Sequence, residues 1–245
     1  MTQRRWNRPF LSYILIAMSC LVIDCNGSKA NEICVSQTIN ASEATAISEI
    51  VKSCDNDNQN DFLRKRTVGF GDYVCLKSYL HLNTARKYLK VVKNAKYVFV
   101  HNNAGGVSTT GAKIGDDIFD HKRTLIISGY CASACADYLF PAAEKVIFIG
   151  PFSKGSFLAW HGSPDSDGLR ANVTPENHKK ALEAHHDFLQ RFTPAHREQL
   201  SRLMDISRDG LSISEERKQK KTWTYTDDEL CHTFGFDNLY RLLTR

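Results

Sequence analysis

Apolar runs and amphipathic stretches alternate between residues 73 and 160 of this 245-residue chain. Unbroken apolar runs of about four to eight residues predict buried strands, and apolar positions that recur about every three or four residues predict helices. The strands predicted in this way are 73–80, 97–101, 124–128, 145–149 and 157–160, and the helices between them are 83–92, 110–120 and a stretch that ends near 143. Strands that alternate with helices are typical of βαβ units, so we expect an α/β fold with a parallel sheet.

Helix-start signals identify further helices on both sides of this region. Asn40 is followed by Glu43 at capping-box spacing, and Asn83 stands where it would cap a helix. Thr174 precedes Pro175, a pair that favours an N-cap and a first helical position. The additional helices are 41–51, 175–192, 194–205 and a last helical turn at 227–234.

The first thirty residues have the layout of a secretory leader. Residues 2–9 are basic, residues 10–23 are apolar, and Ser28-Lys29-Ala30 provides a small-x-small cleavage motif. An apolar run this short does not span a bilayer, which needs about 20 residues. We therefore expect export to the periplasm with cleavage after Ala30. Two alternatives stay open: an uncleaved leader, which would leave a weak membrane association through a tether, and a lipoprotein signal at Cys20.

The remainder of the chain contains no internal repeat, low-complexity segment or Pro/Gly/Ser-rich linker. We expect a signal peptide at 1–30, an N-terminal extension at 31–70 and one α/β domain at 71–245. Hydrophobic residues (42%) and charged residues (24%) occur in proportions ordinary for a globular protein. The net charge is +5, and the basic run at 217–221 has no interleaved aromatic residues, so we expect a solvated loop and no nucleic-acid partner.

Six cysteines remain after cleavage of the leader, and an even number in an oxidising compartment favours disulfides. They are Cys34, Cys54, Cys75, Cys131, Cys135 and Cys231, and their fifteen possible connectivities stay open. Cys131 and Cys135 have no second pair at zinc-ligand spacing, which disfavours a metal site. A bridge between them would be strained if they lay one turn apart on a helix. We therefore expect their partners elsewhere, at Cys231 or among the N-terminal cysteines.

Three predicted strands end in residues that can do chemistry. Gly105-Gly106 follows strand 97–101, Ser133 follows 124–128, and His161 follows 157–160. Taken singly, these residues also fit a tight turn, a packing serine and a structural histidine. Because the carboxyl ends of parallel strands meet at one edge of a sheet, we expect them to lie together. Together they supply the parts of an acyl-transfer site: a hydroxyl nucleophile, a base, and backbone N–H groups for an oxyanion.

Three stretches, in this order, carry a family resemblance: NNAGGVSTTGAKIGDDI, TLIISGYCASACADYLFPAA and FLAWHGSP. They resemble the proteolytic subunit of Clp protease and the related signal peptide peptidases. They are more similar still to exported bacterial proteins of this clan that have a Cys-x-Ser-x-Cys motif. The resemblance covers residues 70–165 and extends to 226–237.

The resemblance implies a crotonase/Clp protease-like β/α superhelix with Ser133 as the nucleophile and His161 as the general base. The backbone N–H groups of Gly106 and Ala134 would form the oxyanion hole. It further implies that no metal or other cofactor is needed. The substrate would be a peptide or an unfolded protein, and the chain would form a homo-oligomer.

The chain departs from this family at the third catalytic residue. The family has an aspartate shortly before its closing helix, but here that position falls near Lys221 and Thr222, where no acid occurs. Asp205 and Asp209 lie upstream of this position, and Asp227 lies downstream. Loss of the orienting acid lowers the rate of serine proteases strongly. A Ser–His dyad, a displaced acid and an inactive site therefore all remain open.

Two further sets of residues match no catalytic or metal motif. Lys113 and Lys154 are near enough in sequence for a serine–lysine pair, as in signal peptide peptidases, but neither lies in a recognisable motif. His178, His185 and His186 fall on one predicted helix without an H-E-x-x-H pattern, so we expect a solvent-exposed helix face rather than zinc.

The leading hypothesis is an exported serine hydrolase, a peptidase of the Clp protease-like clan. The alternative is a catalytically inactive periplasmic binding or assembly protein that keeps the crotonase fold. Acyl-CoA chemistry occurs on the same fold, but export disfavours it because coenzyme A is a cytoplasmic cofactor.

Overall fold

The structure is a computed structural model that describes residues 39–55, 63–68, 71–77, 79–151, 155–161, 174–204 and 223–243. All of these residues belong to one unit of the chain, Cys34–Arg245. The predicted signal peptide at 1–30 lies outside the described residues. Within the described ranges, no helix is both long enough and apolar enough to cross a bilayer.

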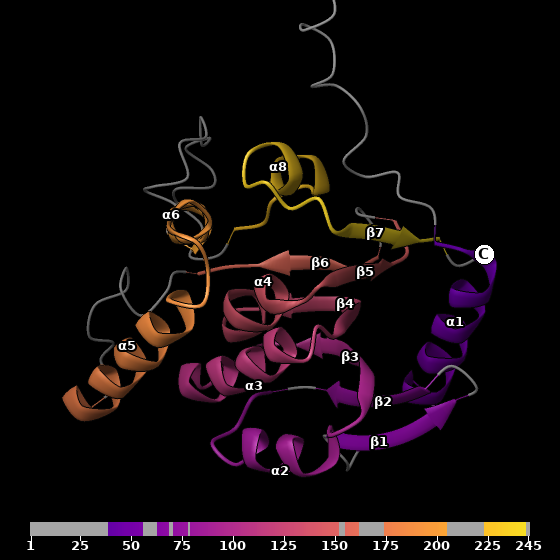
Figure 1. The fold of residues 1–245 in the computed structure, drawn as a ribbon, viewed down its shortest axis with the longest axis horizontal. Helices are drawn as coiled ribbons and strands as arrows, with labels where there is room; N and C mark the ends of the chain where they lie inside the picture. Colours follow the sequence, from indigo (N-terminus) through magenta and orange to yellow (C-terminus); the bar gives the residue numbers. More distant parts are fainter. Residues whose placement is uncertain are drawn as a thin grey trace, which may run out of the picture. The chain divides into compact units, whose positions relative to one another are not determined.

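A seven-stranded sheet forms the centre of the described part of the chain (Figure 1). Its strands are β1 (Leu63–Val68), β2 (Gly71–Lys77), β3 (Ala95–Asn103), β4 (Thr124–Ala132), β5 (Lys145–Ile149), β6 (Phe157–Ala159) and β7 (Leu239–Leu242). Their order is β1-β2-β3-β4-β5-β7, and β6 pairs with the end of β4. Only β1 runs antiparallel to its neighbour, so the predicted α/β fold with a parallel sheet is confirmed.

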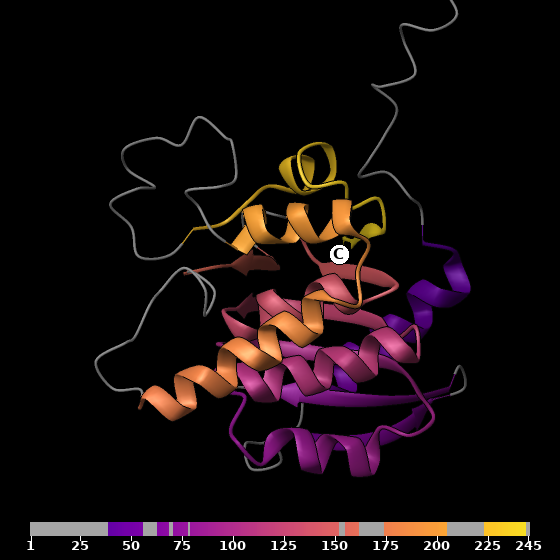
Figure 2. The same ribbon diagram turned by 60° about the vertical axis from the view of Figure 1, so that its left-hand side comes forward.

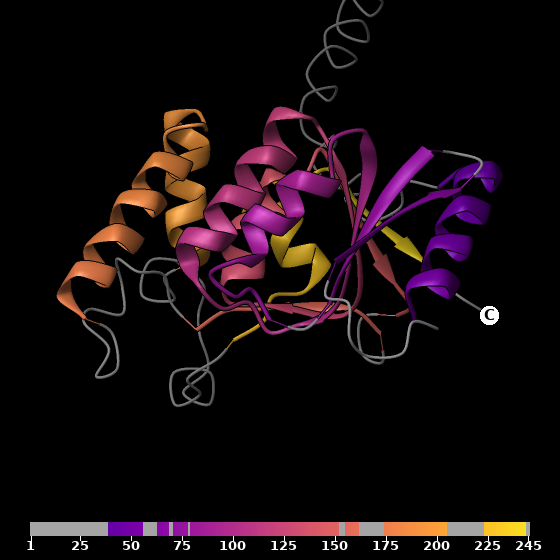
Figure 3. The same ribbon diagram turned by 90° about the horizontal axis from the view of Figure 1, so that it is seen from below.

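Helices cover both faces of this sheet (Figure 3). They are α1 (Ala41–Asp55), α2 (Thr84–Val91), α3 (Ser108–Asp120), a π-helix (Cys135–Leu139), α4 (Phe140–Ala142), α5 (Pro175–Leu189), α6 (Pro194–Met204) and α8 (Asp227–His232). Helix α1 lies on one face, and α2, α3 and α5 lie on the other. Helix α5 packs against α3, as Figures 1 and 2 both show.

Each face of the sheet has its own hydrophobic core, because alternate residues of a strand point to opposite sides. Val98 and Val100 of β3 face the larger core beneath α2, α3 and α5. Tyr97 and Phe99 of the same strand face the smaller core, where they pack with Ile47 of α1. Burial on both faces explains why the central strands are continuous apolar runs rather than alternating ones.

Two strands were not predicted from the sequence. Both lie at the edges of the sheet, β1 beside β2 and β7 beside β5. Their sequences, LRKRTV and LYRL, are short and contain charged residues, so they have no apolar run of the kind that marks the central strands. Strand β1 and helix α1 both fall within the expected N-terminal extension, which therefore contributes to the sheet and its core.

The two asparagine caps differ from each other. The Oδ1 atom of Asn40 accepts a hydrogen bond from the backbone N–H of Glu43 (2.8 Å), as predicted. The carboxylate of Glu43 does not return to Asn40 but pairs with Lys145 at 2.7 Å. Asn83 makes no side-chain cap, because its backbone is helical (φ −88°, ψ −5°) instead of extended.

Candidate active site

The carboxyl ends of β3, β4 and β6 bring the predicted residues to one edge of the sheet. Asn103 at the end of β3 is in register with Cys131 of β4, and Ala132 of β4 is in register with Ala159 of β6. The Gly105-Gly106 loop, Ser133 and His161 each follow within two residues of these positions. The register of the sheet therefore confirms that the ends of these three strands lie together.

Ser133 occupies a sharp turn between β4 and the helix that follows. Its φ is +53°, a left-handed value that is unusual for a residue other than glycine. Such a conformation costs about 1–3 kcal/mol and persists only where the surroundings enforce it. Two hydrogen bonds do so here: the Ser133 N–H donates to Ala159 O (2.9 Å), and the Asp137 N–H donates to Ser133 O (2.8 Å). A strand–turn–helix of this kind presents a serine hydroxyl at the sheet edge.

His161 lies within hydrogen-bonding distance of this serine. The His161 Nε2 and Ser133 Oγ atoms are 2.6 Å apart, and both residues are half-buried. Donation from Oγ–H to Nε2 requires the neutral histidine tautomer that carries its proton on Nδ1. The preceding residue, Trp160, is buried and exchanges two backbone hydrogen bonds of 2.8 Å with Trp223. This bridge fixes the strand that leads into His161.

Gly105 packs directly against the serine turn. A Cβ atom at this position would lie 2.3 Å from Ala132 O, 2.7 Å from Ala134 N and 2.8 Å from Ser133 Cβ. The φ of Gly105 is +77°, which also favours glycine. The close approach of two backbones therefore requires glycine here, and it places the glycine loop beside the start of the next helix.

Two backbone N–H groups at this contact, those of Gly106 and Ala134, are the candidates for binding a negative oxygen. Leu80 N–H donates to Gly105 O (2.6 Å) and Val107 N–H donates to Leu80 O (2.9 Å), so the N–H of Gly106 between them faces away from Leu80. Ala134 is the first residue after the turn, where a helix N–H has no acceptor within the helix. Two such donors can stabilise an oxyanion.

Asn103 positions the glycine loop and was not identified from the sequence. Its side chain is fully buried, and its Oδ1 atom accepts a hydrogen bond from Gly105 N–H at 2.9 Å. Its Nδ2 atom has no hydrogen-bond partner among the described residues. The sequence does contain a pattern that could have identified this residue. An asparagine two residues before a glycine pair is typical of a turn in which the asparagine side chain accepts a hydrogen bond from the backbone.

The two cysteines that flank Ser133 are bonded to each other, so the expectation that their partners lie elsewhere was wrong. Cys131 is on β4 and Cys135 begins the π-helix, with the serine turn between them. Their Cα atoms are 5.3 Å apart, within the usual range for a disulfide. They are not one turn apart on a helix, which was the geometry that argued against a bridge. This disulfide closes the base of the turn.

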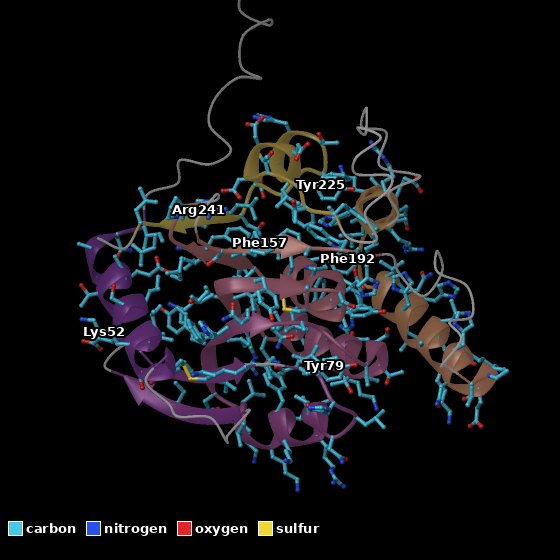
Figure 4. The ribbon with its side chains drawn as sticks, turned by 180° about the vertical axis from the view of Figure 1, so that it is seen from behind. Lys52, Tyr79, Phe157, Phe192, Tyr225 and Arg241 are labelled. Atoms are coloured by element: carbon cyan, nitrogen blue, oxygen red, sulfur yellow. A yellow bond between two sulfur atoms is a disulfide. The ribbon has the colours of Figure 1, made fainter. Side chains whose placement is uncertain are left out.

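Three further cysteines are also bridged. Cys54 of α1 pairs with Cys75 of β2, with a Cα–Cα distance of 5.9 Å, which ties α1 to the sheet (Figure 4 shows both disulfides). Cys231 is also disulfide-bonded. Bridged cysteines are compatible with an exported protein.

Asp227 forms an ion pair with Arg241. Both of its carboxylate oxygens accept hydrogen bonds from Arg241, one from Nη2 at 2.7 Å and one from Nε. Arg241 also donates to Gly150 O (2.9 Å) and Ser156 O (3.3 Å), next to β6 (Arg241 is labelled in Figure 4). Asp227 therefore helps to hold the segment before β6 through Arg241.

Of the other candidates for a third catalytic group, Lys113 is the one that lies among the described residues. Asp205, Asp209 and Lys154 lie outside the described residues. Lys113 is exposed on α3.

The histidines of α5 do not share one exposed face. His185 is buried, and its Nδ1 atom lies 3.2 Å from the hydroxyl of Tyr138. The prediction of an exposed face was therefore wrong for His185, because α5 packs this side against the helix that follows Ser133. His186 is exposed as expected. Among the described residues, no cluster of three or more His, Cys, Asp or Glu side chains is arranged to hold a metal ion.

No protein-family model matches the chain, and a search of curated proteins finds no match.

Proposed function

We propose that this chain is a serine hydrolase in which Ser133 is the nucleophile and His161 the general base. The observation that carries the proposal is the 2.6 Å contact between Ser133 Oγ and His161 Nε2 at the sharp turn after β4. A hydroxyl is a weak nucleophile unless a base accepts its proton. The contact supplies that base, and the turn presents the hydroxyl at the edge of the sheet.

The proposed reaction proceeds in two halves. Ser133 Oγ attacks the carbonyl carbon of the substrate while its proton passes to His161 Nε2. The carbonyl oxygen becomes negative and accepts hydrogen bonds from the N–H groups of Gly106 and Ala134. The proton then passes from Nε2 to the leaving group, which departs and leaves an acyl group on Ser133. Water attacks this ester while His161 Nε2 accepts its proton, and that proton then passes to Ser133 Oγ as the bond to the acyl group breaks and the acid product leaves.

The resemblance to the Clp protease clan extends this proposal to peptide bonds. It rests on the Gly-Gly, Cys-x-Ser-x-Cys and Trp-His stretches in their order along the chain, and it implies the crotonase-like β/α superhelix of that clan. The parallel sheet with the three stretches at its carboxyl edge supports this finer assignment. The disulfides support export to the periplasm. A peptide or unfolded protein is therefore the proposed substrate, and a homo-oligomer is the proposed assembly.

A second candidate is a binding or assembly protein that keeps the fold without turnover. The sequence near Lys221 and Thr222 favours it, because the family that the chain resembles has its catalytic aspartate at this position and this chain does not. Replacement of that aspartate lowers the rate of serine proteases strongly. The two candidates differ in whether Ser133 reacts with an electrophile.

A fluorophosphonate probe separates the two functions, because it reacts with activated serines. We expect the folded, oxidised protein to be labelled, and the label to disappear in Ser133→Ala. Ser128→Ala is the matched control: Ser128 Oγ lies 3.2 Å from His101 Nδ1, so it forms another Ser–His contact but is not at the turn. This variant should label like the wild type. An absence of labelling at neutral and mildly alkaline pH would refute the hydrolase and favour the binding protein.

A further inference from the structure

Residues 79–96 carry the whole net charge of the chain. The stretch contains no aspartate or glutamate, and its five basic residues are Arg86, Lys87, Lys90, Lys93 and Lys96. The chain has 32 basic and 27 acidic residues in all, so the part outside this stretch has 27 of each. A positive charge that is concentrated in one short segment creates a local field that attracts anions.

Helix α2 and the residues up to the start of β3 hold these five cations on the outside of the fold. Ala85 and Tyr88 of α2 are buried in the larger core, whereas all five basic residues are exposed. Arg86 and Lys90 are four positions apart, so they lie on one side of the helix. Helix α2 lies at the lower edge of the described fold in Figures 1 and 2. We call these five residues the basic face.

The charges of the basic face are not balanced within the described part of the chain. None of its five side chains forms an ion pair with a described residue. Arg86 and Lys87 fall in the first turn of α2, where the helix dipole disfavours cations, and that turn has no acid. Arg86 also repels Lys90 one turn further on. This arrangement costs stability, which indicates that the charges serve a partner rather than the fold.

Exposed apolar side chains accompany the basic face. Leu82 is 75% exposed, Leu89 is 44% exposed and Tyr79 is 42% exposed. Among the described residues, the one other large apolar side chain with comparable exposure is Leu243. Leu89 is on α2 itself, three positions after Arg86, and Leu82 lies in the turn that leads into the helix. Cations and apolar side chains therefore share one part of the surface.

Tyr79 connects this part of the surface to the glycine loop beside Ser133. A Cβ atom at Gly106 would lie 2.8 Å from both Cε1 and Cζ of the Tyr79 ring, so the ring packs on the backbone of that glycine (Tyr79 is labelled in Figure 4). The ring also meets His81 edge-on, with centroids 4.9 Å apart. The surface beside the basic face therefore reaches the loop that supplies one proposed oxyanion donor.

A bilayer that contains anionic lipids matches both properties of this surface. Each lysine or arginine side chain near such a membrane strengthens binding about fivefold. Exposed leucines add affinity when they enter the boundary between the headgroups and the acyl chains. Nucleic acids and other soluble polyanions offer the charge but no apolar layer, so they do not account for the exposed leucines.

We propose that the basic face docks on the surface of a membrane that contains anionic phospholipids. The five cations lie against the lipid phosphates, and Leu82 and Leu89 enter the headgroup layer beside them. The docked protein is peripheral, since only single side chains enter the bilayer. The inference goes beyond the proposed hydrolase and does not depend on it, because none of these side chains takes part in the proposed reaction.

Sedimentation with vesicles tests this proposal. The full chain is mixed with vesicles of phosphatidylglycerol and phosphatidylcholine in equal parts and, in parallel, with vesicles of phosphatidylcholine alone. We expect binding to the mixed vesicles to be at least about tenfold stronger, and to weaken as salt rises from about 0.05 M to about 0.5 M. All variants keep the N-terminal segment, so differences between variants report on the basic face and its leucines.

Removal of two charges tests the electrostatic contact. Lys90→Gln together with Lys93→Gln should weaken binding to the mixed vesicles about 25-fold, at about fivefold per residue. Lys179→Gln with Lys180→Gln is the matched control, because it removes the same charge from exposed positions of α5. There each lysine is paired with a glutamate of the same helix, so this control should bind like the wild type.

Removal of the leucines tests the apolar contact. Leu82→Ser together with Leu89→Ser should weaken binding at least about tenfold, since neither side chain can then enter the headgroup layer favourably. Leu243→Ser is the matched control, because this leucine is also exposed (67%) but follows β7 at the other edge of the sheet. It should bind like the wild type.

Three results would overturn the proposal: equal binding to both kinds of vesicle, equal loss in the charge variants of α2 and α5, or wild-type binding by the double leucine variant. The last result would indicate a soluble acidic partner instead of a membrane. Ser133→Ala should bind vesicles like the wild type, so a failure of the hydrolase and a failure of this proposal are distinguished. If a variant does not fold, the two kinds of vesicle and the salt series on the wild type still decide.

Discussion

Replacement of Gly105 by alanine should damage the serine site and the fold together. The added Cβ would lie 2.3 Å from Ala132 O, 2.7 Å from Ala134 N and 2.8 Å from Ser133 Cβ. All three atoms belong to the turn itself, so none can move aside as the end of a flexible side chain would. The turn or the glycine loop must shift, and the N–H groups proposed to bind the oxyanion must shift with it.

The size of the effect follows from two contributions. An alanine at the φ of Gly105, +77°, costs about 1–2 kcal/mol, and forced overpacking costs about 1–3 kcal/mol. The free energy of unfolding should therefore fall by about 2–5 kcal/mol. Loss of one oxyanion donor lowers the rate of acyl transfer by about 100- to 1,000-fold, so reaction of Ser133 with a fluorophosphonate should slow by a comparable factor.

Gly71→Ala is the matched control for this variant. Gly71 also has a positive φ, +125°, but a Cβ there would meet no atom within 4 Å. It should lose only the backbone contribution of about 1–2 kcal/mol and should label at the wild-type rate. Urea unfolding and the rate of labelling measure the two effects. The reasoning is refuted if Gly105→Ala unfolds no more easily than Gly71→Ala and labels as fast as the wild type.

Three further predictions concern bridges and charges. Replacing both cysteines of the Cys131–Cys135 bridge by serine should lower stability by about 2 kcal/mol, from the entropy of a five-residue loop, and slow labelling; the same change at Cys54–Cys75 should cost about 3 kcal/mol and leave labelling of the folded protein unchanged. Arg241→Met should destabilise by about 3–5 kcal/mol because it leaves the buried Asp227 carboxylate unpaired, and adding Asp227→Leu should recover most of that loss in urea unfolding. Burial lowers the pKa of His196 in the folded protein, so the unfolded chain binds a proton at this residue at a higher pH than the folded protein does. The contribution of His196 to the free energy of unfolding is therefore complete above pH 6.5, the ordinary pKa, and declines as the pH falls below it. His196→Phe should flatten this part of the curve of unfolding free energy against pH. An unchanged slope would contradict a lowered pKa at His196.

The central part of the fold was predictable because burial on both faces leaves a clear mark on the sequence. Strands β3, β4 and β5 appear as runs such as YVFV, TLIIS and KVIFI. The edge strands β1 and β7 have no such mark, since their positions depend on pairing with a neighbour rather than on their own apolar content. Asn83 shows a related limit: its residue type fits a cap, but the backbone conformation that would let it cap is set by the loop before it.

The candidate site, like the fold, was predictable from the sequence only in part. Ser133, His161 and the glycine pair were identified because strand ends in parallel sheets converge, and the register of β4 with β3 and β6 brings them together. The Cys131–Cys135 bridge was missed because the distance between two cysteines depends on where the strand stops and the helix starts. The bonding of Asp227 to Arg241 was equally hidden, because the two residues are 14 positions apart and meet only through β7.

The proposed function depends on acylation of Ser133 with His161 as the base. The direct test is intact-mass and peptide-mapping analysis of protein that is mixed with an activated acyl ester and quenched in acid. We expect an acyl group on Ser133 that forms rapidly, is lost on longer incubation, and does not form in folded His161→Gln. Acylation of Ser133 with His161 as the base is contradicted if the folded protein gains no acyl group, if the group lies on another residue, or if His161→Gln is acylated at the wild-type rate.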